Sequence, residues 1–187
     1  MLGRLTVILL SLTVVVGQTV QEYTQQASQL VLQYDWEEAV RILGAGLDRY
    51  PDQPELLLQL GTLMVRSGQV VRGERLLLQA LEIQPGNSEA LRSAADAQLR
   101  QGHLSAAIDL LRESISQSGD NVESHHSLAR SLLAQEEVEP ALEHARQAID
   151  LNPLDPRFHR LYAFLLEAQG DQAKADQQLR LAYRLAP

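Results

Sequence analysis

The chain has no cysteine, few aromatic residues and a single lysine. The absence of cysteine excludes disulfides, thiol nucleophiles, cysteine-based zinc sites and a lipidated N-terminal cysteine. Aromatic residues make up only 4% of the 187 residues, so a core has to be built mainly from leucine and alanine, which suits closely packed helices. Hydrophobic residues nevertheless reach 45%, and this content is too high for a disordered chain.

Positive charge is also scarce. Sixteen Lys and Arg residues stand against twenty-four Asp and Glu residues, which gives a formal net charge of −8. An acidic chain without a basic cluster argues against nucleic-acid partners and against binding to anionic membrane surfaces. We attribute the use of arginine in place of lysine to a GC-rich genome rather than to a need for bidentate carboxylate binding.

No hydrophobic run in the sequence is long enough to span a bilayer. The longest follows Arg4 and runs from Leu5 to Gly17, which is well short of the roughly 20 residues that a spanning helix needs. Small residues at Val15 and Gly17 fit a signal-peptidase site. We therefore expect residues 1–17 to be a signal peptide, cleaved before Gln18, and the mature chain to be periplasmic or secreted without stable membrane insertion. The alternative is an uncleaved N-terminal membrane anchor.

Helix-breaking residues recur with a period of 34. Pro51, Pro85, Pro153 and Pro187 are spaced by 34, 68 and 34 residues, and Gly119 lies at the missing position. This period divides an array over 18–187 into five units without insertions, at 20–53, 54–87, 88–121, 122–155 and 156–187.

Three columns of small residues keep the same phase. The eighth position reads Ala27, Gly61, Ala95, Ala129 and Ala163. The twentieth reads Ala39, Gly73, Ala107, Ala141 and Ala175, and the twenty-seventh reads Gly46, Ala80, Ser114, Ala148 and Ala182. Small residues let two antiparallel helices approach closely, so each unit is predicted to be a helical hairpin. Gly68, Gly102 and Gly170 fall between the two helices of their units, where a left-handed residue ends the first helix.

At these residues the chain resembles a tetratricopeptide repeat protein. The second unit matches best, with Leu57-x-x-Leu60-Gly61-x-x-Met64 followed by Gly68, Gly73, Leu77, Ala80 and Pro85. The resemblance covers residues 20–187 and implies an all-α, right-handed superhelical solenoid of five antiparallel helix pairs. The sequence departs from the family pattern at Glu136, which replaces the turn glycine, and at His125 and His159, where the family has a large ring.

Catalytic signatures are absent from the sequence. It contains no phosphate-binding glycine loop, no H-E-x-x-H and no G-x-S-x-G. His125 and His126 are adjacent and point to different helix faces, so they are poorly placed to chelate one ion. His125 and His159 lie 34 residues apart, and we expect them to stack side by side in a seam. We predict no metal, no cofactor and no enzymatic activity.

The resemblance also implies a ligand groove. In the family, ligands lie against the first helix of each unit, on the second, fifth, sixth, ninth, twelfth and thirteenth positions. Carried over residue by residue, the groove residues are Arg92, Arg100, His126, Arg130, Arg157 and Arg160. Arginine forks suit carboxylates, so the predicted partner is a protein or peptide with acidic groups. Alternatively, Arg92, Asp96 and Arg100 pair along their own helix, which is worth a few tenths of a kcal/mol.

The C-terminal unit suggests a second surface. At the twenty-sixth position, earlier units have residues that tolerate water, whereas the fifth has Leu181, close to Tyr183 and Leu185. Because no further repeat follows to cover them, these three residues predict an end-to-end homodimer or a docking patch. The sequence thus favours an exported, non-catalytic scaffold for protein–protein or protein–peptide interaction. The alternative is a structural or assembly module that self-associates through its C-terminal helix pair.

Overall fold

The computed structural model describes residues 18–186, which form ten α-helices and no strand. Their bounds are α1 Val20–Leu32, α2 Trp36–Arg49, α3 Pro54–Arg66, α4 Val70–Ile83, α5 Ser88–Arg100, α6 Leu104–Gln117, α7 Val122–Ala134, α8 Val138–Leu151, α9 Pro156–Gln169 and α10 Gln172–Leu185. Residues 1–17, on which the predicted signal peptide falls, lie outside the described residues.

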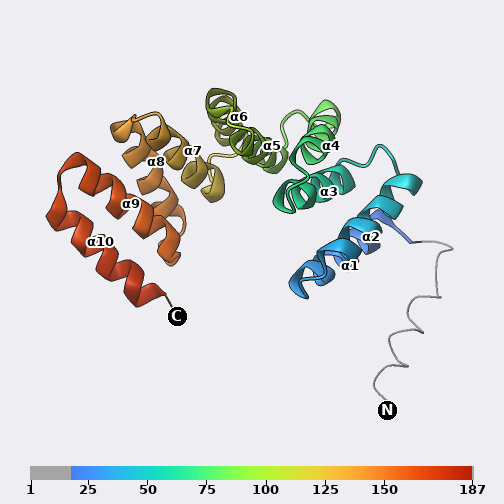
Figure 1. Cartoon of the computed structure of the whole chain (residues 1–187), viewed down its shortest axis with the longest axis horizontal. Coiled ribbons are helices and arrows are strands. Elements are labelled where there is room, and N and C mark those ends of the chain that lie inside the picture. Colours follow the sequence, from blue (N-terminus) through green and yellow to red (C-terminus); the bar gives the residue numbers. More distant parts are fainter. Residues whose placement is uncertain (1–17, 187) are drawn as a thin grey trace, which may run out of the picture.

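The helices form an arch (Figure 1). The odd-numbered helices line its inner side and the even-numbered helices its outer side, and each odd-numbered helix packs against the even-numbered helix that follows it. The core is a series of hydrophobic clusters along the arch, from Tyr23 and Leu43 near one end to Leu132 and Leu165 near the other. The predicted all-α solenoid of five helix pairs is confirmed.

The small-residue columns lie in the contacts between helices. All fifteen residues of the three columns are buried. A very close contact joins α3 to α4, where a Cβ atom added to Gly73 would lie 2.6 Å from the carbonyl oxygen of Gly61 and 2.8 Å from the backbone nitrogen of Val65. No side chain fits at this contact. At the eighth and twentieth positions the second unit accordingly has glycine, where the other four units have alanine.

Each turn between the two helices of a unit uses a left-handed residue. Gly68, Gly102 and Gly170 have φ values of 91°, 82° and 92°. Tyr34 and Glu136 hold the same position in the first and fourth units, with φ values of 62° and 63°. A side chain in this conformation costs roughly 1–2 kcal/mol, so these two units carry backbone strain that the other three avoid.

Two buried histidines hold the turns that precede their helices. The Nε2–H groups of His125 and His159 donate to the carbonyl oxygens of Gly119 and Pro153, at 3.2 and 2.9 Å. The expected stacking of these two histidines on each other is wrong. Each ring instead turns to the outer helix of its own pair, where His125 Nδ1 lies 3.1 Å from His144 Nδ1 and His159 Nδ1 lies 2.8 Å from Gln178 Oε1.

Two glycine substitutions are expected to change stability in opposite directions. Gly44 and Gly73 both lie within helices, but a Cβ atom at Gly44 would have no neighbour within 4 Å. Gly44→Ala should stabilise the chain by about 1 kcal/mol through helix propensity. Gly73→Ala should destabilise it by about 1–3 kcal/mol, because the helices have to separate. Thermal melting followed by circular dichroism tests this, and a shift of the same sign in both variants would contradict the close contact.

The His125–His144 pair is expected to weaken the fold in acid. Because His125 Nε2–H is committed to a carbonyl, its Nδ1 accepts a hydrogen bond from His144 Nδ1–H in the neutral pair. Burial lowers the pKa of His144, positive charge on His125 and Arg112 lowers it further, and Glu143 opposes them. The folded state thus disfavours protonated His144, and stability should fall as the pH drops below the ordinary histidine value of about 6.5.

His144→Gln gives the fourth unit the partner that the fifth unit has at Gln178, 34 residues later. The substitution removes the imidazole whose pKa is lowered, and the glutamine amide can still offer its oxygen or its nitrogen to the His125 ring. Melting temperatures measured between about pH 7 and pH 5 should fall less in this variant than in the wild type. His103→Gln, at an exposed histidine, should keep the wild-type slope. Identical slopes in all three proteins would disprove the role of the pair.

Candidate functional site

The inner side of the arch carries an apolar hollow near its N-terminal end. It has a volume of about 500 Å³ and lies mainly between α1 and α3. Its residues are Ala27, Ser28, Val31, Leu32, Leu43, Leu58, Gln59, Thr62, Leu63, Arg66 and Glu89. Leu32, at the end of α1, is 80% exposed. We refer to this set as the apolar hollow.

A second hollow, of about 450 Å³, follows along the same inner side between α5 and α7. Three arginines from these two successive inner helices, Arg92, Arg100 and Arg130, line it together with Asp96. Its other residues are Leu99, Leu104, Ser127, Ser131 and Ala134. We refer to Arg92, Arg100 and Arg130 as the arginine cluster.

The three arginines differ in how strongly they are held. Arg92 is largely covered and pairs with Glu89, one turn earlier on α5. Burial lowers the pKa of Arg92, but the hydrogen bond and charge of Glu89 outweigh this effect, so the pKa is raised and the side chain stays charged. Arg100 pairs with Asp96 at 2.9 Å, and both side chains remain partly exposed. Arg130 makes no ion pair with any of residues 18–186.

The other three predicted groove residues lie outside this cluster. Arg157 is engaged twice, with Asp155 at 2.7 Å and with Glu123 of the preceding unit at 2.6 Å, and these bonds raise its pKa. The His126 ring packs against Phe158, with ring centroids 5.1 Å apart, and burial lowers its pKa. Arg160 is exposed and lines neither hollow.

The apolar hollow was not among the sequence-based predictions. Its residues Leu32 and Leu58 hold the thirteenth and fifth positions of their units, which are positions that the family resemblance assigns to the groove. The signal was therefore present in the first two units, but in a helical pattern an apolar residue is ordinarily taken as part of the core.

The predicted C-terminal interface is only partly exposed. Leu181 and Leu185 are half-buried, whereas Tyr183 is 78% exposed. Tyr183 lies beside Arg180 and Arg184 in a shallow hollow along α10 that Asp176 also lines. This surface is more polar than expected from the sequence, and its use in self-association stays a prediction.

Residues 18–186 offer little for other kinds of site. They contain no group of three or more His, Asp or Glu side chains placed to hold a metal ion. Among the described helices, none combines the length and hydrophobicity required to cross a bilayer. What the inner side provides is an open surface of fixed side chains, which suits recognition of an extended segment.

Comparisons with known proteins agree with this architecture. A family model described as tetratricopeptide repeat matches residues 30–97 and 98–165. Among curated protein sequences, none matches significantly. Among solved structures, pilF from Pseudomonas aeruginosa has a TM-score of 0.82 at 17% identity, over 89% of this chain and 76% of its own.

Two further structures are similar over nearly their whole length. TTC0263, a thermophilic repeat protein from Thermus thermophilus, has a TM-score of 0.78 at 20% identity, over 89% of this chain and 91% of its own. MamA from Desulfovibrio magneticus has a TM-score of 0.74 at 19% identity, over 91% of this chain and 97% of its own. Identities this low establish the fold alone, whereas the family model matches most of the sequence. The chain therefore belongs to the tetratricopeptide repeat family.

Proposed function

We propose that the protein is a scaffold that binds an extended segment of another protein on the inner side of its arch, and that the arginine cluster contacts acidic groups of that segment. Members of this family are protein-interaction scaffolds, which supports the general role. The observation that carries the specific proposal is the convergence of Arg92, Arg100 and Arg130 in one hollow of a chain whose net charge is −8.

The ion pairs around the cluster leave it able to accept a ligand. Arg130 has no acidic partner among residues 18–186 and can bind a carboxylate directly. The exposed pair of Arg100 with Asp96 is of a kind worth only about 0.2–1 kcal/mol, so its exchange for a ligand carboxylate costs little. The guanidinium groups offer planar, bidentate donors that match carboxylate oxygens. The mechanism is recognition, with no covalent step.

Substitution of the cluster should weaken binding without unfolding the chain. We expect Arg92→Ala, Arg100→Ala and Arg130→Ala combined to reduce capture of partner proteins from envelope and secreted fractions, because the variant loses its carboxylate contacts. The salt dependence of the remaining binding should also be smaller. Quantitative mass spectrometry of the captured proteins measures both effects, and circular dichroism should show unchanged helix content.

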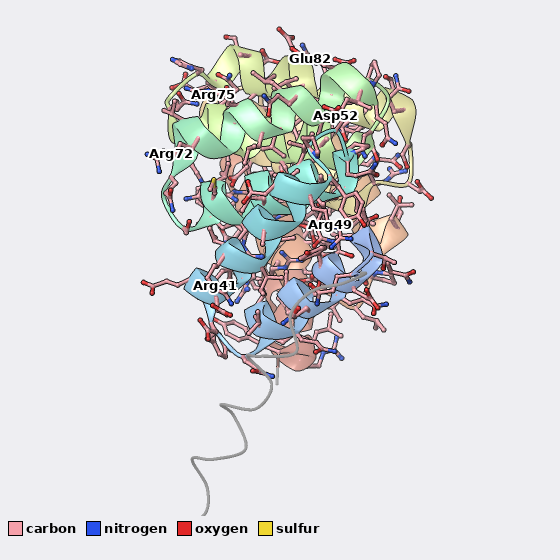
Figure 2. All side chains as sticks on the ribbon, turned by 90° about the vertical axis from the view of Figure 1, so that its right-hand side faces the viewer. Arg41, Arg49, Asp52, Arg72, Arg75 and Glu82 are labelled. Atoms are coloured by element: carbon pink, nitrogen blue, oxygen red, sulfur yellow. The ribbon has the colours of Figure 1, made fainter. Side chains whose placement is uncertain are left out.

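A matched control removes three arginines from the outer helices. Arg41, Arg72 and Arg75 belong to α2 and α4, and all three are exposed (Figure 2). Their combined change to alanine alters the net charge by the same amount as the cluster variant does. Because these arginines lie outside the groove, capture should stay at the wild-type level. Equal losses in the two triple variants would indicate a general charge effect, and undiminished capture by the folded cluster variant would refute the proposal.

We also propose that the scaffold works outside the cytoplasm. Support comes from the sequence alone, since Arg4, the apolar run and the small residues at Val15 and Gly17 fit a secretory signal. N-terminal sequencing of the protein from its native host should find a mature chain that begins at or near Gln18. An intact Met1 on membrane-bound protein would support the anchor, whereas an intact Met1 on soluble cytoplasmic protein would exclude export.

A further inference from the structure

We infer that the groove recognises a two-part ligand: a peptide segment with a bulky apolar side chain for the apolar hollow and, on the side towards α7, a carboxylate for the arginine cluster. This inference rests on the proposed function and adds to it the apolar half of the ligand and the order of the two halves along the groove. The supporting observations are the state of the polar groups in the apolar hollow and the continuity of the two hollows.

Almost every polar group in the wall of the apolar hollow already has a partner within the protein. The Ser28 hydroxyl donates to the carbonyl oxygen of Thr24 at 2.8 Å, and the Thr62 hydroxyl donates to Ser93 Oγ at 3.0 Å. Glu89 is paired with Arg92. The surface that remains available to a ligand is mainly the hydrocarbon of Val31, Leu32 and Leu58.

Two further groups define the edges of this hollow. The Arg66 guanidinium lies over the Trp36 ring, 4.9 Å from its centroid, so this cation is held at the rim by an aromatic ring. The amide of Gln59 has no hydrogen-bond partner among residues 18–186, and it also lines an adjoining polar hollow with Gln21, Gln25 and Gln29. A free amide at the edge of an apolar surface suits the backbone of an extended peptide, which offers both N–H and C=O groups.

The two hollows are neighbouring parts of one groove. Glu89 lines the apolar hollow while its ion-pair partner Arg92 lines the charged one. The hydrogen bond from Thr62 to Ser93 joins α3 to α5 between them. A single extended segment laid along the odd-numbered helices (Figure 1) therefore meets the apolar hollow first and the arginine cluster next.

Size and charge fit a peptide of this composition. An apolar hollow of about 500 Å³ is within the range of roughly 300–1,000 Å³ that ligand sites occupy. An uncharged apolar ligand would leave Arg130 without a counter-charge, and a purely acidic one would leave the exposed Leu32 uncovered. A segment with both features satisfies the whole groove.

Selection from a displayed library of random dodecapeptides on the whole chain tests the inference. We expect the enriched peptides to share an apolar residue and an Asp or Glu at a fixed spacing. A synthetic consensus peptide, measured by fluorescence anisotropy, should bind the Leu32→Gln/Leu58→Gln variant about tenfold or more weakly, because burial of even one leucine side chain is lost. The arginine-cluster variant should lose the preference for acidic residues and keep that for apolar ones.

The control changes two exposed leucines outside the groove, Leu78→Gln and Leu154→Gln, which are 47% and 72% exposed. It should bind the consensus peptide as the wild type does. An acidic consensus without an apolar residue, or equal binding by the Leu32/Leu58 variant, would overturn the two-part ligand and leave the proposed function standing. An apolar consensus insensitive to the arginine cluster, or no enrichment at all, would overturn both.

Discussion

The close contact between the two helices of each unit is the constraint on which the rest of the structure depends. In the second unit the backbones approach so closely that a Cβ atom at Gly73 would lie 2.6 Å from Gly61 O, and in the third unit Ala95 and Ala107 are fully buried at the same two positions. Because only small residues fit there, each unit forms a close helix pair, and the five stacked pairs generate an arch with one inner side (Figure 1). The groove is thus a consequence of helix packing, and its existence requires no particular residue on its surface.

This separation frees the inner positions to differ from unit to unit. The fifth position reads Thr24, Leu58, Arg92, His126 and Arg160 along the array, while the packing columns beneath it hardly change. The result is a surface whose chemistry varies in one direction, from hydrocarbon over α1 and α3 to guanidinium over α5 and α7. A repeat array can change its ligand in this way without a change of fold, because contacts within and between neighbouring units carry the stability.

The fold was predictable from the sequence because its signals are local and recur with the period of 34. These signals are the columns of small residues and the glycines in the turns. The candidate site was predictable only in part. The groove positions taken from the family resemblance include Arg130, which lines the second hollow. They also include Arg157, whose charge is already engaged by Glu123 in the preceding unit. Leu32 has the helical spacing of a core residue, and only the arrangement of the helices reveals that it is 80% exposed. The sequence period does not show which neighbouring residue, if any, lies against each side chain. That depends on the direction in which each side chain points from its helix.

If the proposed ligand binds as inferred, the two hollows of the groove contribute differently to affinity and to selectivity. No buried side-chain nitrogen or oxygen among residues 18–186 lacks a hydrogen-bond partner, so the first hollow has no unsatisfied buried group for an apolar side chain to cover. An unsatisfied group of this kind would cost about 1–3 kcal/mol. The second hollow is different, because the Arg100–Asp96 pair is partly exposed and Arg130 is unpaired within the described chain. Exposed charges of this kind steer encounter and reject unsuitable partners more than they add affinity. In the proposed complex, dissociation would be governed by the leucine-lined end of the groove and association by the arginines, so salt should change the association rate far more than the dissociation rate.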